Sequence, residues 1–194
     1  MMSELKPELR HILESQQFEK PFMLEIFRVA EMLREMMKRG EREALRQILK
    51  GRVFASLFYE ASTRTRFSFD FAAEHLGARV IGTENAGIFS SVAKGESLED
   101  TISVVCEYYP DAIILRHPED GAAEKAAKIS SVPIINGGDG KGQHPTQALL
   151  DVYSIYREIG GVDGITVVMG GDLANGRTVR SLSYLLTKFR DVKI

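Results

Sequence analysis

Short apolar segments alternate with longer segments of helical periodicity along most of the chain, and this alternation limits the fold more than any other feature. The apolar segments are too short for helices and are predicted to be strands, at residues 53–58, 79–82, 111–116, 132–135 and 165–169. Helices are predicted at residues 22–39, 67–76, 98–109, 122–129, 146–159 and 178–189. Apolar strands that alternate with helices are typical of a parallel sheet that helices flank on both faces. The predicted fold class is therefore α/β.

A glycine-rich stretch at residues 160–164 (GGVDG) interrupts this pattern and is predicted to be a linker. Before it lie a first domain at residues 1–142 and a connecting helix at residues 143–160. After it, residues 161–194 contain a further strand and helix, and the last four residues are expected to begin another strand. We interpret residues 161–194 as the beginning of a second α/β domain.

Charge and composition exclude several classes of protein. The chain has 25 Lys and Arg residues against 27 Asp and Glu residues, so a nucleic acid is not expected as its partner. Cys106 is the only cysteine, which excludes an internal disulfide and a zinc site built from several thiolates. No apolar run approaches the length of a membrane span, and no secretory signal is recognisable. The sequence therefore predicts a cytoplasmic protein with no membrane partner.

A cluster of hydroxyl and guanidinium groups, Ser62-Thr63-Arg64-Thr65-Arg66, closely follows a predicted strand. The first N–H groups of a helix lack internal acceptors and carry partial positive charge, so phosphate binds there readily. The hydroxyls add short donors, and Arg64 adds a planar fork that matches phosphate oxygens. The alternative is an ordinary helix cap beside solvated arginines. Because the spacing of a P-loop is absent, the cluster predicts an anion site of another kind.

Two further strand ends carry polar side chains, and ligands of parallel sheets bind where strands end. Arg116 closes the strand at residues 111–116, where it either faces the cleft or stops the strand at the surface. A glycine-rich loop at residues 137–147 leads into a helix whose first turn suits Pro145. His144 and Gln147 are three residues apart and are expected near one face of that helix. A capped helix with a polar entry is the alternative.

Two other loops are ambiguous from their residues alone. Residues 90–96 (SSVAKGE) are by themselves typical of a flexible loop between a strand and a helix. Residues 170–178 (GGDLANGRT) follow a predicted strand but lack the G-x-G-x-x-G spacing, so they give a dinucleotide site only weak support.

Taken together, these motifs resemble the carbamoyltransferase family. The resemblance runs from about His11 to the end of the chain and is carried, in order, by FYEASTRTRFSFDFAAEHLG, SSVAKGESLEDT, ILRHP, NGGDGKGQHPTQALLD and GDLANGRT. STRTR and HPTQ are typical of the whole family, whereas RHP, GDG and GDLANGRT point to its aspartate branch rather than its ornithine branch. The resemblance implies that residues 1–142 bind carbamoyl phosphate and that residues 161–194 begin a domain that binds aspartate.

The resemblance implies a transferase that moves the carbamoyl group of carbamoyl phosphate to L-aspartate, giving N-carbamoyl-L-aspartate and phosphate in pyrimidine biosynthesis. The residues that it implies for the phosphate are Ser62, Thr63, Arg64 and Thr65. Those that it implies for the carbamoyl group are Thr65, Arg116 and His144 at the oxygen and Gln147 at the nitrogen. Arg177 is implied for the aspartate carboxylate, while Glu60 and Arg66 are implied to be structural or interdomain residues.

In such a reaction the aspartate amine attacks the carbamoyl carbon, and negative charge grows on the carbamoyl oxygen. Preorganised donors stabilise that charge, and losing one typically raises the barrier by about 3 kcal/mol. The residues expected to be catalytic are Arg64, Thr65, Arg116 and His144, of which His144 acts as a hydrogen-bond donor. The implied mechanism needs no metal and no organic cofactor.

The resemblance also implies a homotrimer with shared sites, in which Ser90 and Lys94 reach the site of a neighbouring subunit. Further candidate partners are a regulatory chain or other enzymes of pyrimidine synthesis. Members of the family have a longer second domain with further aspartate-binding residues in a mobile loop. The 194-residue chain is therefore expected to be C-terminally incomplete and poorly active by itself.

Two other functions stay open from the sequence. One is a carbamoyltransferase for another amine such as ornithine, although an arginine at position 177 suits a dicarboxylate better than a cationic diamine. The other is a non-catalytic domain that binds carbamoyl phosphate.

Overall fold

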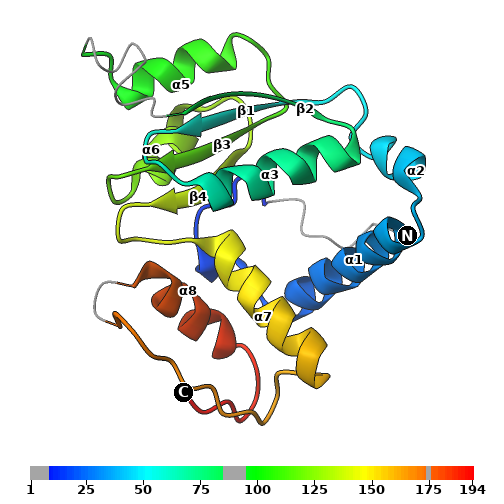
Figure 1. The fold of residues 1–194 in the computed structure, drawn as a ribbon. Coiled ribbons are helices and arrows are strands. Elements are labelled where there is room, and N and C mark those ends of the chain that lie inside the picture. The colour runs from blue at the N-terminus through cyan, green and yellow to red at the C-terminus, as the bar shows by residue number, and fades with distance from the viewer. Residues whose placement is uncertain (1–8, 85–94, 174–175) are drawn as a thin grey trace.

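The computed structural model describes residues 9–84, 95–173 and 176–194 and contains one four-stranded parallel sheet (Figure 1). Its strands are β1 (Val53–Phe58), β2 (Arg79–Glu84), β3 (Ala112–His117) and β4 (Ile134–Asp139), in the spatial order β2-β1-β3-β4. β4 begins two residues later than predicted, after Pro133, which has no N–H to donate to a ladder. The predicted parallel sheet is confirmed.

Helices cover both faces of this sheet, as predicted (Figure 1). On one face lie α5 (Leu98–Cys106) and α6 (Ala122–Ile129). The apolar side chains that form the core there are Ala55, Leu57, Ile102, Cys106, Ile113, Leu115, Ala126 and Ile134. On the other face lies α3 (Thr63–Leu76), whose Phe69 ring approaches β4 so closely that a Cβ at Gly137 would be 3.4 Å from it. The core of this half of the molecule is therefore the buried sheet itself.

The order of the strands creates a reversal between β1 and β3. From β1 the chain passes through α3 to β2 on one side, and from β2 it crosses back by α5 to β3 on the other side. Because crossovers between parallel strands are right-handed, these two connections lie on opposite faces. β1 and β3 stay paired up to Phe58 and Arg116, and the chain leaves their carboxyl ends towards opposite faces of the sheet, which is where open α/β sheets bind ligands.

The helix boundaries mostly follow the local signals in the sequence. α3 ends at Gly77, whose φ of 93° is left-handed and whose missing Cβ leaves room for the backbone oxygen of Arg46. α5 stops at Cys106 rather than continuing to residue 109, because Tyr109 itself takes a positive φ of 55°. The predicted helix at residues 122–129 is confirmed residue for residue as α6.

A second apolar core joins the two ends of the chain. The N-terminal part contains η1 (Ser15–Gln17), α1 (Lys20–Lys38) and α2 (Arg42–Arg46), and the C-terminal part contains α7 (Pro145–Ile159) and α8 (Arg177–Leu186). The buried residues of this core are Phe18, Met23, Phe27, Ala148, Val152, Val162, Leu185, Leu186 and Phe189. Helix α1 therefore packs against residues more than a hundred positions away. Its Met23 and Phe27 are buried in this core, whereas Met32 and Met37 are exposed.

The strand predicted at residues 165–169 is wrong in extent. Its pairing among the described residues is one parallel bridge, between Thr166 and Lys193. The Val167 N–H donates to the Lys193 carbonyl at 2.8 Å, and the Lys193 N–H donates to the Ile165 carbonyl at 2.9 Å. A strand forms where a neighbouring segment supplies hydrogen-bond partners for its backbone groups along its length. The segment predicted to start a strand at residues 191–194 supplies that neighbour at one residue only.

Asp163 ties the segment after α7 to α1. The Lys20 Nζ donates to both carboxylate oxygens at 2.8 Å, and the Arg190 N–H donates to the same carboxylate at 2.9 Å. The hydrogen bond from Lys20, followed by that from the Arg190 backbone, lowers the pKa of Asp163 from 3.8 to about 2. The Lys20 ammonium also lies 5.1 Å from the centre of the Phe189 ring.

Replacing Asp163 by Asn is expected to lower the melting temperature at neutral pH. Because the folded pKa lies below the ordinary value, the carboxylate stabilises the fold fully above about pH 3.8, and its contribution disappears as the pH falls through about 2. Circular dichroism melts of the wild type and Asp163→Asn should therefore converge over that range. Glu158→Gln, which neutralises an exposed carboxylate at the end of α7, is the control and should show no such convergence. A gap that stays constant down to pH 2 would contradict the assignment.

Candidate functional site

The polar residues predicted from the strand ends gather at the carboxyl edge of the sheet. β1 and β3 are directly paired up to Phe58 and Arg116, and just beyond them the Tyr59 N–H donates to the Arg116 carbonyl at 2.9 Å. The chain leaving β1 then runs into Ser62 and the first turn of α3. The hydroxyl and arginine cluster and Arg116 therefore stand at the two sides of the reversal described above.

The cluster is the beginning of α3 rather than a loop before it. Ser62 is the N-cap residue, and Thr63, Arg64, Thr65 and Arg66 form the first turn. The Ser62 carbonyl accepts the first helical hydrogen bond, from the Arg66 N–H at 3.0 Å. Among the described residues, the Ser62 side chain caps no N–H of the helix. An ordinary cap would use that hydroxyl internally, so this observation favours the anion site over the plain cap.

The side chains of this first turn differ in exposure. Thr63 and Arg64 are exposed, whereas Thr65 and Arg66 are partly buried. The Arg66 Nε lies 3.4 Å from the Asp70 carboxylate one turn further along α3. Arg66 is thus engaged within its own helix, while Arg64 is exposed to solvent.

Arg116 is buried, with 7% of its surface exposed, and charged groups at such positions need partners. Its Nη1 donates to the Gly137 carbonyl at 3.1 Å, and its Nη2 lies 3.1 Å from the Glu60 carboxylate. The guanidinium is therefore held between the chain that leaves β1 and the end of β4. Glu60, expected to be structural, is the residue that fixes it.

His144 and Gln147 stand at the start of α7. His144 is the N-cap residue and is buried, and its N–H donates to the Ser181 hydroxyl at 3.3 Å. The Gln147 Nε2 donates to the Asp151 carboxylate at 2.9 Å. Burial raises the pKa of Asp151, and the hydrogen bond from Gln147 partly opposes this rise. With its nitrogen used by Asp151, Gln147 presents its side-chain oxygen as an acceptor.

The structure does not describe the side chains of three predicted site residues. Ser90 and Lys94 lie outside the described residues. Arg177 is the first residue of α8, but its side chain is likewise outside what the structure describes.

The sequence did not reveal two buried polar residues beside the site. Ser181 of α8 accepts from the His144 N–H and donates to the Gln143 Oε1 at 2.8 Å, a contact between residues 38 positions apart that no local pattern signals. Asp139 belongs to the glycine-rich stretch predicted to be a loop, but it is the last residue of β4 and is 6% exposed. Its signal was the acidic residue between glycines, which is also typical of an exposed turn.

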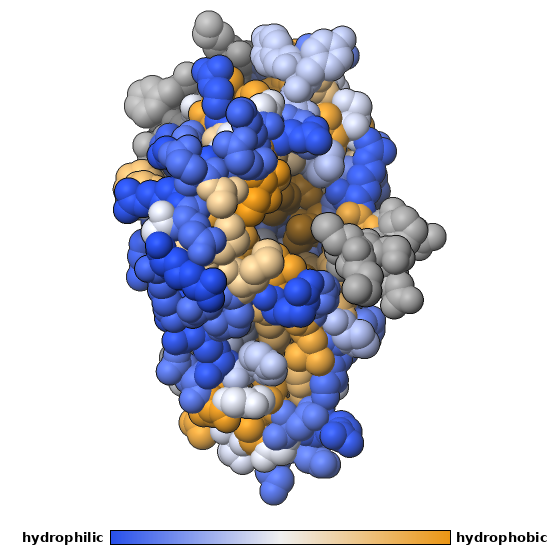
Figure 2. Space-filling view, turned by 90° about the vertical axis from the view of Figure 1, so that its right-hand side faces the viewer, coloured by the Kyte–Doolittle hydropathy of each residue, from blue (hydrophilic) through white to orange (hydrophobic). Residues whose placement is uncertain are grey.

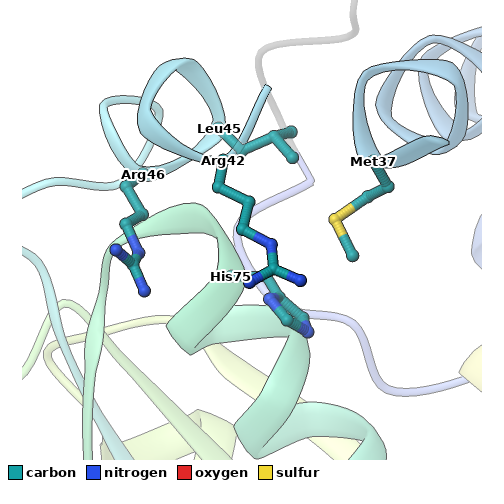
Figure 3. A pocket seen from close by; sticks show the side chains of 5 residues that line it. All are labelled: Met37, Arg42, Leu45, Arg46 and His75. Carbon is teal, nitrogen blue, oxygen red and sulfur yellow. The ribbon is translucent and has the colours of Figure 1, made fainter. Parts of the chain in front are cut away.

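A partly open cavity lies at the other end of α3. This cavity of about 110 Å³ lies between α1, α2 and the C-terminal end of α3, lined by Met37, Arg42, Leu45, Arg46 and His75 (Figure 3). Figure 2 shows that side of the molecule, where apolar side chains surround a hollow between hydrophilic ones. α3 has 14 residues and is therefore about 20 Å long. The cavity is thus remote from the first turn of α3, and the candidate site is an open edge rather than an enclosed pocket.

Two other kinds of site find no support in the part of the chain that the structure describes. That part contains no group of His, Cys, Asp and Glu side chains able to hold a metal ion. None of its helices combines the length and apolar character needed to cross a membrane.

Comparison with known proteins identifies close relatives. The family described as aspartate/ornithine carbamoyltransferase, carbamoyl-P binding domain, matches residues 10–157. The chloroplastic aspartate carbamoyltransferase of Arabidopsis thaliana is 58% identical over 192 residues, which cover 98% of this chain and 48% of that protein. The catalytic subunit of Methanocaldococcus jannaschii aspartate carbamoyltransferase is 48% identical, with 96% of this chain and 59% of the relative covered.

Solved structures agree with these matches. Aspartate transcarbamoylase of Trypanosoma cruzi in complex with carbamoyl phosphate and aspartate superposes with a TM-score of 0.88 at 39% identity, covering 95% of this chain and 56% of that one. The chain thus spans about half the length of the curated plant relatives that it matches.

Gly140→Ala is expected to disturb the loop at residues 140–143 more strongly than alanine usually disturbs a position of positive φ. Gly140 has a φ of 43°, and a Cβ there would lie 2.6 Å from the Asp120 backbone nitrogen. Gly160 also has a positive φ, of 77°, but has open space around it. Gly160→Ala should cost about 1–2 kcal/mol of unfolding free energy from backbone strain alone. Urea denaturation should show a clearly larger loss of unfolding free energy for Gly140→Ala than for Gly160→Ala. Equal losses would mean that the loop of Gly140 moves away from Asp120 at no cost.

Proposed function

The chain belongs to the aspartate/ornithine carbamoyltransferase family, and on this premise we propose that it acts in the transfer of a carbamoyl group from carbamoyl phosphate to L-aspartate. The products would be N-carbamoyl-L-aspartate and phosphate. The observation that carries the proposal is the first turn of α3, whose N-cap hydroxyl is not used for capping and which stands beside buried Arg116. The choice of aspartate is supported by relatives of 57–59% identity that are named aspartate carbamoyltransferases.

The phosphate group would bind at the start of α3. Unused backbone N–H groups and the positive end of the helix favour an anion there. The hydroxyls of Ser62, Thr63 and Thr65 would donate to phosphate oxygens, and exposed Arg64 would pair with the charge. As the phosphate departs, its charge increases, and the same donors would stabilise the leaving group.

The carbamoyl group would lie towards β3 and α7. Arg116, His144 and Thr65 would donate to the carbamoyl oxygen, where negative charge grows as the amine attacks. Arg116 suits this role because Glu60 and the Gly137 carbonyl hold its guanidinium in one place before the substrate arrives. The carbamoyl nitrogen carries hydrogens and needs an acceptor, which the Gln147 oxygen would supply while Asp151 holds its nitrogen. The reaction needs no cofactor because the amine is itself the nucleophile.

Arg177 would recognise the second substrate through a carboxylate, because it begins α8 and an arginine repels the cationic side chain of ornithine. A domain division at residues 1–142, 143–160 and 161–194 would place Arg177 opposite the carbamoyl-phosphate domain. The family match ends at residue 157, which supports a boundary near residue 160. The Ser181 contact with His144 would keep α8 next to the carbamoyl site.

The assembly is also a proposal. A homotrimer would bring Ser90 and Lys94 of one subunit into the site of its neighbour. It is supported by the aromatic side chains that α3 leaves exposed, Phe67 at 52% and Phe71 at 59%, with ring centres 6.0 Å apart. Relatives named as a catalytic subunit and as the multifunctional protein CAD support a regulatory chain or fused pyrimidine enzymes as further partners. A cytoplasmic location remains the proposal from the sequence, although the plant relatives are named chloroplastic.

Arg64→Ala is expected to weaken binding of carbamoyl phosphate and of inorganic phosphate alike. A hydrogen bond to a charged group contributes about 1.5–3 kcal/mol, so both dissociation constants should rise roughly 10- to 100-fold in isothermal titration calorimetry. Arg79→Ala removes an exposed arginine at the opposite end of the sheet and serves as the control. Unchanged binding of both ligands in Arg64→Ala would contradict the proposal that phosphate binds at the start of α3.

The reaction itself is tested with labelled carbamoyl phosphate and, in parallel, aspartate or ornithine. Labelled carbamoyl aspartate, formed slowly and without citrulline, is the expected result. Formation of citrulline alone would show that the protein uses ornithine and would contradict the choice of aspartate. Tight binding without transfer to either amine would support the non-catalytic alternative.

Sedimentation velocity tests the trimer. The wild type is expected to sediment as a trimer, and the double variant Phe67→Asp, Phe71→Asp as a monomer, because two charges would have to be buried in the contact. Ile159→Asp places a charge on an exposed apolar residue at the end of α7 and should leave the trimer intact. A monomeric wild type would contradict the shared sites.

A further inference from the structure

Asp139, at the end of β4, is a buried carboxylate outside the proposed set of substrate contacts. Its side chain is 6% exposed, and burying a charge is costly unless donors replace the lost water. One carboxylate oxygen accepts from the Gly121 N–H at 3.1 Å. The other accepts from the Gln143 N–H at 3.1 Å and from the Asn136 Nδ2 at 3.2 Å. Three N–H donors therefore converge on this carboxylate from three positions in the chain.

The donors belong to loops that carry two of the proposed catalytic residues. Gly121 closes the loop at residues 118–121, which follows the end of β3 one residue after Arg116. Gln143 closes the loop at residues 140–143, which follows β4 and precedes His144 directly. We call these two segments the loop pair. By accepting from both, the Asp139 carboxylate joins the chain after β3 to the chain before α7.

Other contacts reinforce the same junction. The Gly140 N–H donates to the His117 carbonyl at 2.9 Å, and the Arg116 Nη1 donates to the Gly137 carbonyl at 3.1 Å. On the solvent side, the Lys141 N–H donates to the carboxylate of exposed Asp120. The loop pair is thus closed from inside by Asp139 and from outside by Asp120.

We propose that Asp139 is a positioning residue of the carbamoyl-phosphate site, and that it sets His144 relative to Arg116 by holding the loop pair together. This inference rests on the proposed function. Its consequence is a division of labour between elements. The phosphate end of the ligand depends on α3, which follows β1, whereas the carbamoyl end depends on the loops after β3 and β4, which Asp139 joins.

Asp139→Asn is the sharpest test because it keeps the shape of the side chain. An asparagine has one acceptor oxygen, and its NH₂ group would face an N–H where the carboxylate now accepts. The contact with either Gly121 or Gln143 must then be lost. Glu124→Gln, which neutralises an exposed carboxylate on α6, is the matched control for charge. Asp120→Ala removes the outer acceptor at an exposed position and serves as a second variant whose fold is not at risk.

The measurement is calorimetric binding of carbamoyl phosphate and of inorganic phosphate to the 194-residue chain and to each variant. Asp139→Asn is expected to raise the dissociation constant for carbamoyl phosphate about tenfold while leaving that for phosphate within about twofold. Asp120→Ala should also raise the dissociation constant for carbamoyl phosphate more than that for phosphate, but by a smaller factor. Glu124→Gln should change neither constant. Amide hydrogen exchange should also become faster at Gly121 or Gln143 in Asp139→Asn and remain unchanged in Glu124→Gln.

The outcomes separate this inference from the proposed function. Equal weakening of both ligands, or no weakening of either, in Asp139→Asn would overturn the positioning role while the wild type still binds. If Asp139→Asn does not fold, an unchanged ratio of the two constants in Asp120→Ala would overturn it. A wild-type chain that binds neither ligand would overturn the proposed function and this inference with it.

Discussion

The candidate site depends on the reversal of strand order between β1 and β3. Parallel strands end at one edge of a sheet, and their connections normally fill that edge with neighbouring loops. Here the connection from β1 leads to one side, and the next crossover passes back to the other side. The two connections part at this place, between the start of α3 and the end of β3. Without the reversal, the same residues would be ordinary surface loops.

Polar groups at this edge are held by hydrogen bonds and ion pairs between different elements, in addition to the hydrogen bonds within the sheet and the helices. Arg116 is kept by Glu60 and the Gly137 carbonyl, and His144 by the Ser181 hydroxyl. Each of these contacts joins elements that are far apart in the sequence. The Arg116 side chain and the His144 backbone are therefore ordered before a substrate binds, and such preorganisation is the physical requirement for stabilising a developing charge. In contrast, Thr63 and Arg64 at the phosphate end are exposed.

The second core connects this edge to the chain ends. Phe18, Met23 and Phe27 pack against α7 and α8, and Lys20 pairs with Asp163 beyond α7. α7 begins with His144 at the candidate site and contributes Ala148 and Val152 to this core. Packing at the N-terminal helix is thus coupled, through one rigid helix, to the position of His144.

The sequence by itself determined the fold class, the extent of β1 and α6, the end of α3 at Gly77 and the type of ligand expected after β1. These features are local, because strand burial, helix periodicity and left-handed glycine are written in neighbouring residues. Tertiary structure alone decided the order of the strands, the packing of α1 on α7 and the shortening of residues 165–169 to one bridge. It also decided that Asp139 and Ser181 are buried beside His144, because a hydrogen bond between distant residues leaves no periodic trace in the chain.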